Sequence, residues 1–143
     1  MSYFYYNANP EQKSEPDCTI RAISFLLKQT WDKTFDDICK VAKEMKSMPS
    51  VNRVWGRYLM RKGYEPHFIP NTCPWCYTVR DFCEDNPQGE FLLALDGHVV
   101  VVVNGNYYDT WDSGGEIPFY FWKKEYSLRW VVDLCVVISL MTV

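Results

Sequence analysis

The sequence has few of the features that mark nucleic-acid-binding or secreted chains. Lys and Arg number 15 against 18 Asp and Glu, so the formal net charge is −3. Binding to a phosphate backbone requires a surplus of basic side chains on one face, and we therefore expect no nucleic-acid partner. The N-terminal segment MSYFYYNANPEQK lacks the basic, apolar and cleavage-site regions of a signal peptide. We expect six reduced thiols and a cytoplasmic protein.

Long apolar runs are also missing. A membrane-spanning helix needs roughly 20 apolar residues, whereas the apolar C-terminal segment, 124–143, has a shorter run that contains Asp133. We interpret this segment as a terminal strand or a docked segment. The chain has 143 residues, of which 48% are hydrophobic and 23% charged, and it shows no internal repeat. This profile predicts a single globular domain over 1–143, in which 1–16 is a polar lead-in.

The hydrophobic pattern changes from helical to strand-like along the chain. Apolar residues at helical spacing predict helices over 18–29, from a cap at Thr34, and from a cap at Ser50 to a stop at Gly63. A short strand over 64–70 and a short helix over 78–84 follow. Runs of β-branched and aromatic residues predict strands over 90–96, 98–103, 107–111 and 117–122. Helices followed by antiparallel strands indicate an α+β fold.

Histidine is scarce, with only two in the chain, and this scarcity narrows the search for catalytic residues. Cys18 begins a predicted helix, where free N–H groups and the helix dipole stabilise a thiolate. A nucleophilic cysteine also needs a histidine as proton carrier and a polar group that orients the imidazole. His67 lies on a short strand with Glu65 as its polar neighbour, whereas His98 opens the run GHVVVVVNGNYYDTWD. His98 is the preferred partner of Cys18.

The orienting carboxylate depends on the hairpin that follows His98. A three-residue turn over 104–106 places Asp112 opposite His98 on the same face of the sheet. A two-residue Asn104-Gly105 turn shifts the register by one and places Asp109 diagonally on that face instead. We favour Asp112 and keep Asp109 as the alternative.

These residues carry a resemblance to a known superfamily. A cysteine on the first turn of an N-terminal helix, a Gly-His that opens a strand and an Asp on the next strand resemble the papain-like cysteine peptidases. The run GHVVVVVNGNYYDTWD is also similar to that part of bacteriocin-leader peptidases. The Asp-Cys helix start and the Asp-Thr-Trp-Asp strand resemble small papain-like proteins of bacteriophages. The resemblance implies N-terminal helices that carry the cysteine, followed by an antiparallel sheet that carries the histidine and the aspartate.

The resemblance also implies an activity. It predicts a thiol hydrolase that cleaves a peptide or isopeptide bond, needs no cofactor or metal, and acts in a host cytoplasm if the chain is of phage origin. Papain-like enzymes carry a Gln six residues before the nucleophile that supports the oxyanion, and Gln12 holds that position before Cys18. Trp111 corresponds to an aromatic residue that shields the His–Asp contact. Deamidases and transglutaminases share the same set of residues.

A second, local resemblance connects DCTIRAIS with the ovarian-tumour-type deubiquitinases, whose Asp-Gly-Asn-Cys motif is followed by Arg-Ala-hydrophobic-Ser. Glu15 stands three positions before Cys18, where that family has Asp, and the residues after His98 do not match its histidine region. This likeness indicates a shared chemistry and gives no support for ubiquitin as a substrate.

Two other interpretations compete with an enzyme. The first is a catalytically silent papain-like domain that binds a partner, for example a phage factor that acts on a host protein. The second is a zinc- or redox-sensing module built on the cysteines 73, 76 and 83 with His67, although the ligand spacing is irregular. We prefer the peptidase because the cysteine, the histidine and the aspartate occur in the order that the resemblance requires.

Overall fold

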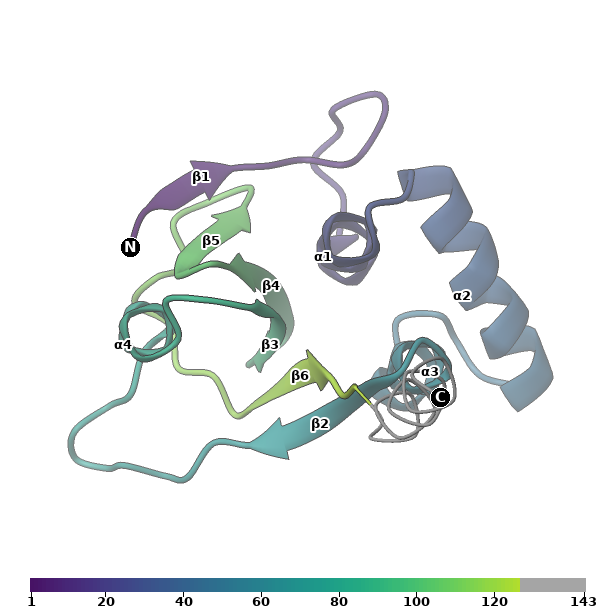
Figure 1. Ribbon diagram of the computed structural model, residues 1–143. Coiled ribbons are helices and arrows are strands. Elements are labelled where there is room, and N and C mark those ends of the chain that lie inside the picture. Colours follow the sequence, from purple (N-terminus) through teal and green to yellow (C-terminus); the bar gives the residue numbers. More distant parts are fainter. Residues whose placement is uncertain (127–143) are drawn as a thin grey trace, which may run out of the picture.

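The computed structural model describes residues 1–126 of the chain, which form four helices and a six-stranded mixed sheet (Figure 1). The elements follow in the order β1 (Tyr3–Tyr5), α1 (Cys18–Leu27), α2 (Trp31–Met45), α3 (Asn52–Arg61), β2 (Tyr64–Phe68), α4 (Val79–Asp85), β3 (Glu90–Leu95), β4 (His98–Val103), β5 (Asn106–Asp109) and β6 (Tyr120–Lys124). The α+β class predicted from the sequence is confirmed.

We predicted an antiparallel sheet, but the sheet is mixed. Its strand order is β1-β5-β4-β3-β6-β2, and β1 pairs with β5 in parallel, with Tyr3 opposite Tyr107 and Tyr5 opposite Asp109. The other neighbours are antiparallel. A parallel pair needs a long connection, and the helices and the strands β2, β3 and β4 lie between β1 and β5 in the chain. The first strand therefore covers the edge of β5.

Two of the predicted helix starts are shifted. The N-cap of α2 is Thr30, whose side chain accepts a hydrogen bond from the Lys33 N–H. Thr34, the predicted cap, lies inside the helix and is fully buried, where its hydroxyl accepts a hydrogen bond from Ser24 Oγ. A threonine can cap a helix or join a buried polar network, and its sequence neighbourhood does not distinguish these roles. The third helix, α3, follows Val51 and not Ser50.

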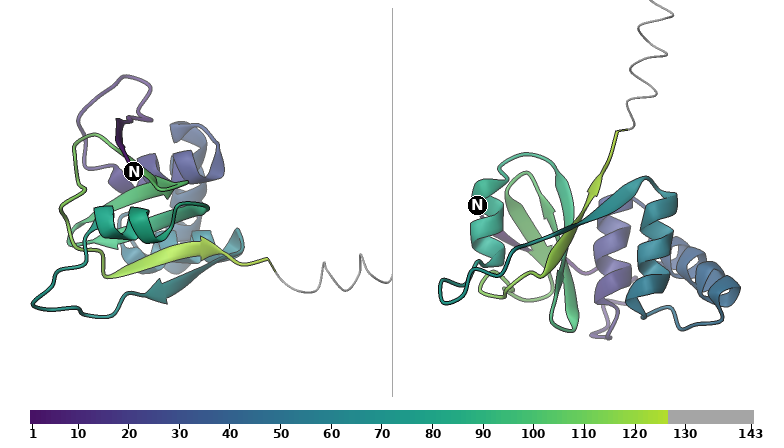
Figure 2. Two further views of the ribbon diagram at one scale, coloured as in Figure 1. Left: turned by 60° about the vertical axis from the view of Figure 1, so that its left-hand side comes forward. Right: turned by 90° about the horizontal axis from the view of Figure 1, so that it is seen from below.

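The sheet separates two hydrophobic clusters, because alternate side chains of a strand point to opposite faces. Leu92 and Ala94 on β3 pack in the cluster that includes α1, α2 and α3. Leu93 and Leu95 pack in the cluster on the other face, which includes α4. Figure 2 shows this arrangement, with three helices on one side of the sheet and the short α4 on the other. Both faces of β3 and β4 are therefore buried.

The β4–β5 hairpin has a two-residue turn. Asn104 and Gly105 both have positive φ, 49° and 72°, and Val103 pairs with Asn106. Positive φ at both central residues is typical of the type I′ turn that Asn-Gly favours. The three-residue turn that we favoured is therefore wrong, and every side chain of β5 faces the side opposite to that expectation.

The predicted C-terminal strand or docked segment lies outside the described residues, apart from 124–126. Strand β6 extends further toward the C-terminus than the predicted 117–122 and reaches Lys124. In the portion of the chain that the structure describes, no helix is both long enough and apolar enough to cross a membrane.

Candidate active site

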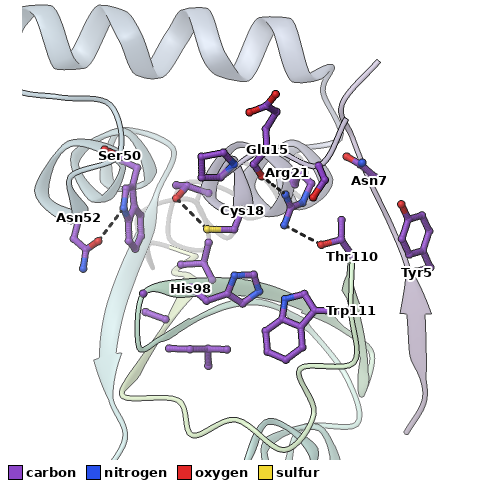
Figure 3. A pocket seen from close by; sticks show the side chains of 18 of the residues that line it. Tyr5, Asn7, Glu15, Cys18, Arg21, Ser50, Asn52, His98, Thr110 and Trp111 are labelled. Carbon is purple, nitrogen blue, oxygen red and sulfur yellow. Dashed lines mark hydrogen bonds between the residues drawn. The ribbon is translucent and has the colours of Figure 1, made fainter. Parts of the chain in front are cut away.

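A pocket of about 690 Å³ lies where the first turn of α1 meets the start of β4 and the residues just after β5 (Figure 3). Its lining includes Cys18, His98 and Trp111. The N-terminal segment before α1 forms one wall, and the start of α3 forms another. Parts of the chain that are distant in the sequence thus contribute to one cavity.

Cys18 is the first residue of α1 and is partly buried. The preceding residue, Asp17, occupies the N-cap position, but its side chain makes no capping hydrogen bond. The first N–H groups of a helix have no partner within the helix, so they point toward whatever lies at its N-terminus. The sulfur of Cys18 also lies 4.0 Å from the Thr19 hydroxyl.

His98 connects the thiol to a carboxylate. Its Nε2 lies 2.6 Å from Oδ2 of Asp109. The Cys18 sulfur lies next to the imidazole in Figure 3, and the two side chains shift each other's pKa. The Trp111 ring lies 5.3 Å from the imidazole, centroid to centroid, and 44% of Trp111 is exposed. The arrangement is a chain of three titratable side chains beside an open cavity.

The protonation of this pair differs from that of an isolated cysteine and histidine. Burial raises the pKa of the Cys18 thiol, but the hydrogen bond and charge of His98, the Val99 N–H and the Thr19 hydroxyl lower it below its ordinary value. Burial opposes protonation of His98 too, yet its contacts with Asp109 and Cys18 raise its pKa to about 9. Both shifts favour the thiolate–imidazolium pair over the neutral thiol and imidazole.

Asp109 is held from several directions and is almost fully buried, with 4% of its surface exposed. Its Oδ2 accepts a hydrogen bond from the Ser113 hydroxyl at 2.7 Å, and its Oδ1 accepts one from the Thr110 N–H at 2.8 Å. The Arg21 guanidinium lies 3.7 Å from Oδ1. A buried carboxylate with these partners has little freedom to rotate, so it fixes the orientation of the imidazole.

Asp112, the orienting residue that we favoured, is not beside His98. Its carboxylate accepts two hydrogen bonds from Arg80, at 3.0 and 2.9 Å, and further bonds from the Tyr107 hydroxyl and the Gly114 N–H. The cause is the two-residue turn, which moves β5 by one position and leaves Asp109 on the face of His98. The alternative that we kept, Asp109, is the one that the structure places against the imidazole.

Gln12 lines the same pocket as Cys18, but its amide is occupied. The side-chain nitrogen donates to the carbonyl oxygens of Asn7, at 3.2 Å, and Asn9, at 2.9 Å. An amide has two N–H donors, and both have partners here. Both donors of Gln12 are therefore occupied in this structure, and its role toward an oxyanion stays a prediction. The N–H groups at the start of α1 are the donors nearest in sequence to the thiol.

Arg21 was not singled out from the sequence. It lies one turn after Cys18 on α1, and only 7% of it is exposed. It contacts Asp17 on its own helix and Thr110 after β5, with Arg21 Nη2 3.3 Å from the threonine hydroxyl. The sequence offers one indication of this role, which is that Arg21 lies within a helix rich in apolar residues. An arginine buried there needs polar partners, because arginine is rarely fully buried without them.

The other cysteines do not gather with His67 into a metal site. Cys73 and Cys76 are exposed, whereas Cys83 is buried among the residues packed around α4. His67 contacts Glu125, with 3.1 Å between Nε2 and Oε1, and stacks on Phe121. Within residues 1–126, no three side chains of His, Cys, Asp or Glu are placed to hold a metal ion. All five cysteines in this part of the chain are free thiols.

Comparison of the chain with family models, with curated proteins and with solved structures gives no match. Its chemistry must therefore be inferred from the geometry of the pocket.

Proposed function

We propose that this protein is a thiol hydrolase of the papain-like type, which cleaves a peptide or isopeptide bond. The observation that carries the proposal is the connected set of Cys18, His98 and Asp109 in an open pocket, with the sulfur at the start of a helix. A cysteine that only fills the core has no need of a buried imidazole–carboxylate pair. The layout also resembles papain-like enzymes, with a helix that presents the cysteine to strands bearing the histidine and the aspartate.

The mechanism follows from these positions. The thiolate of Cys18 attacks the carbonyl carbon of the scissile bond, and the electron pair of the C=O bond moves to the oxygen. The N–H groups at the start of α1 donate hydrogen bonds to this oxyanion. The imidazolium of His98 gives its proton to the leaving nitrogen as the C–N bond breaks, which leaves a thioester on Cys18.

Hydrolysis of the thioester completes the cycle. His98, now neutral, removes a proton from a water molecule, and the resulting hydroxide attacks the thioester carbonyl. The C–S bond breaks, the acid product leaves, and the proton on His98 restores the ion pair with the thiolate. Asp109 holds the ring in place through both steps and stabilises its charged form, while Trp111 covers part of the imidazole.

The first test is the pH dependence of alkylation by iodoacetamide, read at each cysteine by mass spectrometry. We expect Cys18 to react at lower pH than Cys39, because burial and Asp36 raise the pKa of the Cys39 thiol. In His98→Ala, Cys18 should no longer react at lower pH than Cys39. The proposal is contradicted if Cys18 has the same pH profile of alkylation as Cys39, or if its profile does not change in His98→Ala. Cys18 would then be a core residue.

The second test identifies the reaction. The protein is incubated with a library of peptides from a digested proteome, and the products are compared with those of Cys18→Ala. New peptide termini that need Cys18 would establish a peptidase. Conversion of glutamine to glutamate would indicate a deamidase, and new cross-links between peptides a transglutaminase. No product of any kind, from a protein with an activated Cys18, would favour the catalytically silent binding domain.

A further inference from the structure

The buried charges behind the nucleophile form a second group of contacts, centred on Arg21. Its Nη1 pairs with Asp17 Oδ1 and also donates to the Glu15 carbonyl oxygen at 3.3 Å. Its Nη2 donates to the Thr110 hydroxyl at 3.3 Å and lies 3.7 Å from Asp109. One guanidinium thus connects the residues before α1 with the end of β5, as Figure 3 shows.

The state of Asp17 is unusual for its position. Asp at an N-cap normally accepts hydrogen bonds from the N–H groups of the second or third helical residue. Here Asp17 makes no such bond. One oxygen is taken by Arg21, and the other accepts a hydrogen bond from Trp31 Nε1 at 2.8 Å. Asp17 is itself buried, with 8% exposed, so its charge requires these partners.

Because the Asp17 side chain does not cap α1, the environment of the next residue, Cys18, is changed. A capping carboxylate would take N–H groups of the first helical turn, which otherwise have no partner within the helix. It would also bring a negative charge next to the thiolate, which like-charge repulsion disfavours. The guanidinium of Arg21 and the indole of Trp31 oppose both effects, because they occupy the two oxygens of the carboxylate.

We infer that Arg21 is a positioning residue of the proposed reaction, which neutralises Asp17 and keeps it from capping α1, so that the N-terminus of this helix serves the thiolate and the oxyanion. Through Thr110, the same guanidinium ties the strand end that carries Asp109 to the helix that carries Cys18. This inference rests on the proposed function, since it assigns a role toward an activated Cys18.

The inference is tested with the intact chain by the pH dependence of Cys18 alkylation by iodoacetamide. The charged and titratable groups around Cys18 come from three parts of the fold: Glu15, Asp17 and Arg21 from its own segment, His98 and Asp109 from β4 and β5, and Tyr5 from β1. The pocket residues at the start of α3 carry no charge. The variants therefore change the Asp17–Arg21 pair, and the comparison of the single with the double variant separates the effect of Asp17 from the loss of the Arg21 contacts with Thr110 and Asp109.

In Arg21→Met, Asp17 loses its cation and is free to cap α1. We expect the midpoint of Cys18 alkylation to move to higher pH by about one unit, which is a roughly tenfold loss of rate below the midpoint. In the double variant Asp17→Ala with Arg21→Met, no carboxylate remains to cap the helix, so the midpoint should return to the wild-type value. Arg21→Lys keeps a cation four residues after Asp17, so its midpoint of Cys18 alkylation should lie close to that of the wild type.

Two controls separate this role from a structural one. Thermal unfolding monitors the fold of each variant, and we expect the double variant to remain less stable than the wild type while its thiol recovers. Trp31→Phe removes only the second partner of Asp17 and should move the midpoint in the same direction by a smaller amount. It serves as the test if Arg21→Met does not fold.

The outcomes distinguish the two proposals. The role of Arg21 is overturned if Cys18 is activated in the wild type and the alkylation profile is unchanged in Arg21→Met. The Trp31→Phe profile decides in the same way if Arg21→Met does not fold, and in both cases the proposed function stands. A double variant as impaired as Arg21→Met would also overturn the role of Arg21, because the loss would then be structural. A wild-type Cys18 without any activation would overturn the proposed function itself.

Discussion

At the scale of single residues, the site depends on which carboxylate reaches His98. The imidazole contacts Asp109, and its pKa of about 9 lies well above the ordinary 6.5. Because the folded-state pKa is raised, the imidazolium and the stability that it contributes are fully present below about 6.5 and are lost as pH rises through about 9. The ion pair with Cys18 is therefore expected from the lowered pKa of the thiol up to about pH 9.

Asp109→Asn tests this assignment. The variant removes the negative charge with little change in shape, so we expect the pKa of His98 to fall by about two units toward its ordinary value. The measurement is an NMR titration of the imidazole protons, which is simplified because the chain has only two histidines. Asp112→Asn is the matched control and should leave the titration of His98 unchanged. A shift in Asp112→Asn comparable to that in Asp109→Asn would contradict the orienting role of Asp109.

The sequence was informative about residue types and less so about their neighbours. A cysteine at a helix start and a Gly-His before an apolar strand were visible as local patterns, and the structure brings Cys18 and His98 together. The choice between Asp109 and Asp112 depended on one residue in a turn, which local patterns leave open. The burial of Arg21 could not be read locally either, because its partner Thr110 is 89 residues away.

At the scale of elements, the β4–β5 hairpin sets the site, because its turn determines which face Asp109 occupies. Gly105 has a φ of 72°, and a Cβ there would lie 3.1 Å from the Cys83 carbonyl oxygen and 3.2 Å from Pro87 Cα. The turn is thus held both by its own backbone conformation and by close contact with the end of α4. Both features favour glycine at this position.

Gly105→Ala should therefore destabilise the protein more than a glycine substitution that changes φ alone. The left-handed conformation costs alanine about 1–2 kcal/mol, and the contact with Cys83 and Pro87 adds to this loss. Gly63→Ala is the matched control, since Gly63 has a φ of 85° but nothing within 4 Å of an added Cβ. Urea denaturation of both variants gives the comparison. Equal losses of unfolding free energy would show that the contact at Gly105 is relieved without cost.

Elements with a strong local pattern were predicted well. The strand over 98–103 has the bounds predicted for it, because five consecutive valines lie between a glycine and the Asn-Gly turn. Strand β1 was missed, since three residues carry too little periodicity and its partner β5 is distant in the chain. Edge strands of this kind are determined by tertiary pairing and not by their own sequence.

At the scale of the whole molecule, the two hydrophobic clusters share one sheet. Leu92 and Leu93 are adjacent on β3, both are fully buried, and they face opposite clusters. Truncation of either to alanine leaves a cavity and should cost about 2–5 kcal/mol of unfolding free energy. This pair therefore probes both faces at nearly the same point of the chain.

We expect Leu92→Ala and Leu93→Ala each to unfold in a single transition. Every central strand contributes to both clusters, so neither face can lose its packing while the other keeps its own. Circular dichroism and tryptophan fluorescence, followed together during urea denaturation, check this expectation. A transition in Leu93→Ala that fluorescence and circular dichroism place at different urea concentrations would show that the α4 side unfolds separately.

The long separation between Arg21 and Thr110 in the chain has a consequence for protein synthesis. A ribosome releases the segment that carries Cys18 well before it has made the strands that carry His98 and Asp109. During that interval the thiol has neither its imidazole nor the completed pocket, so it behaves as an ordinary cysteine. The contacts on which the proposed thiol reactivity depends are therefore complete only once almost the whole described part of the chain has been translated and folded.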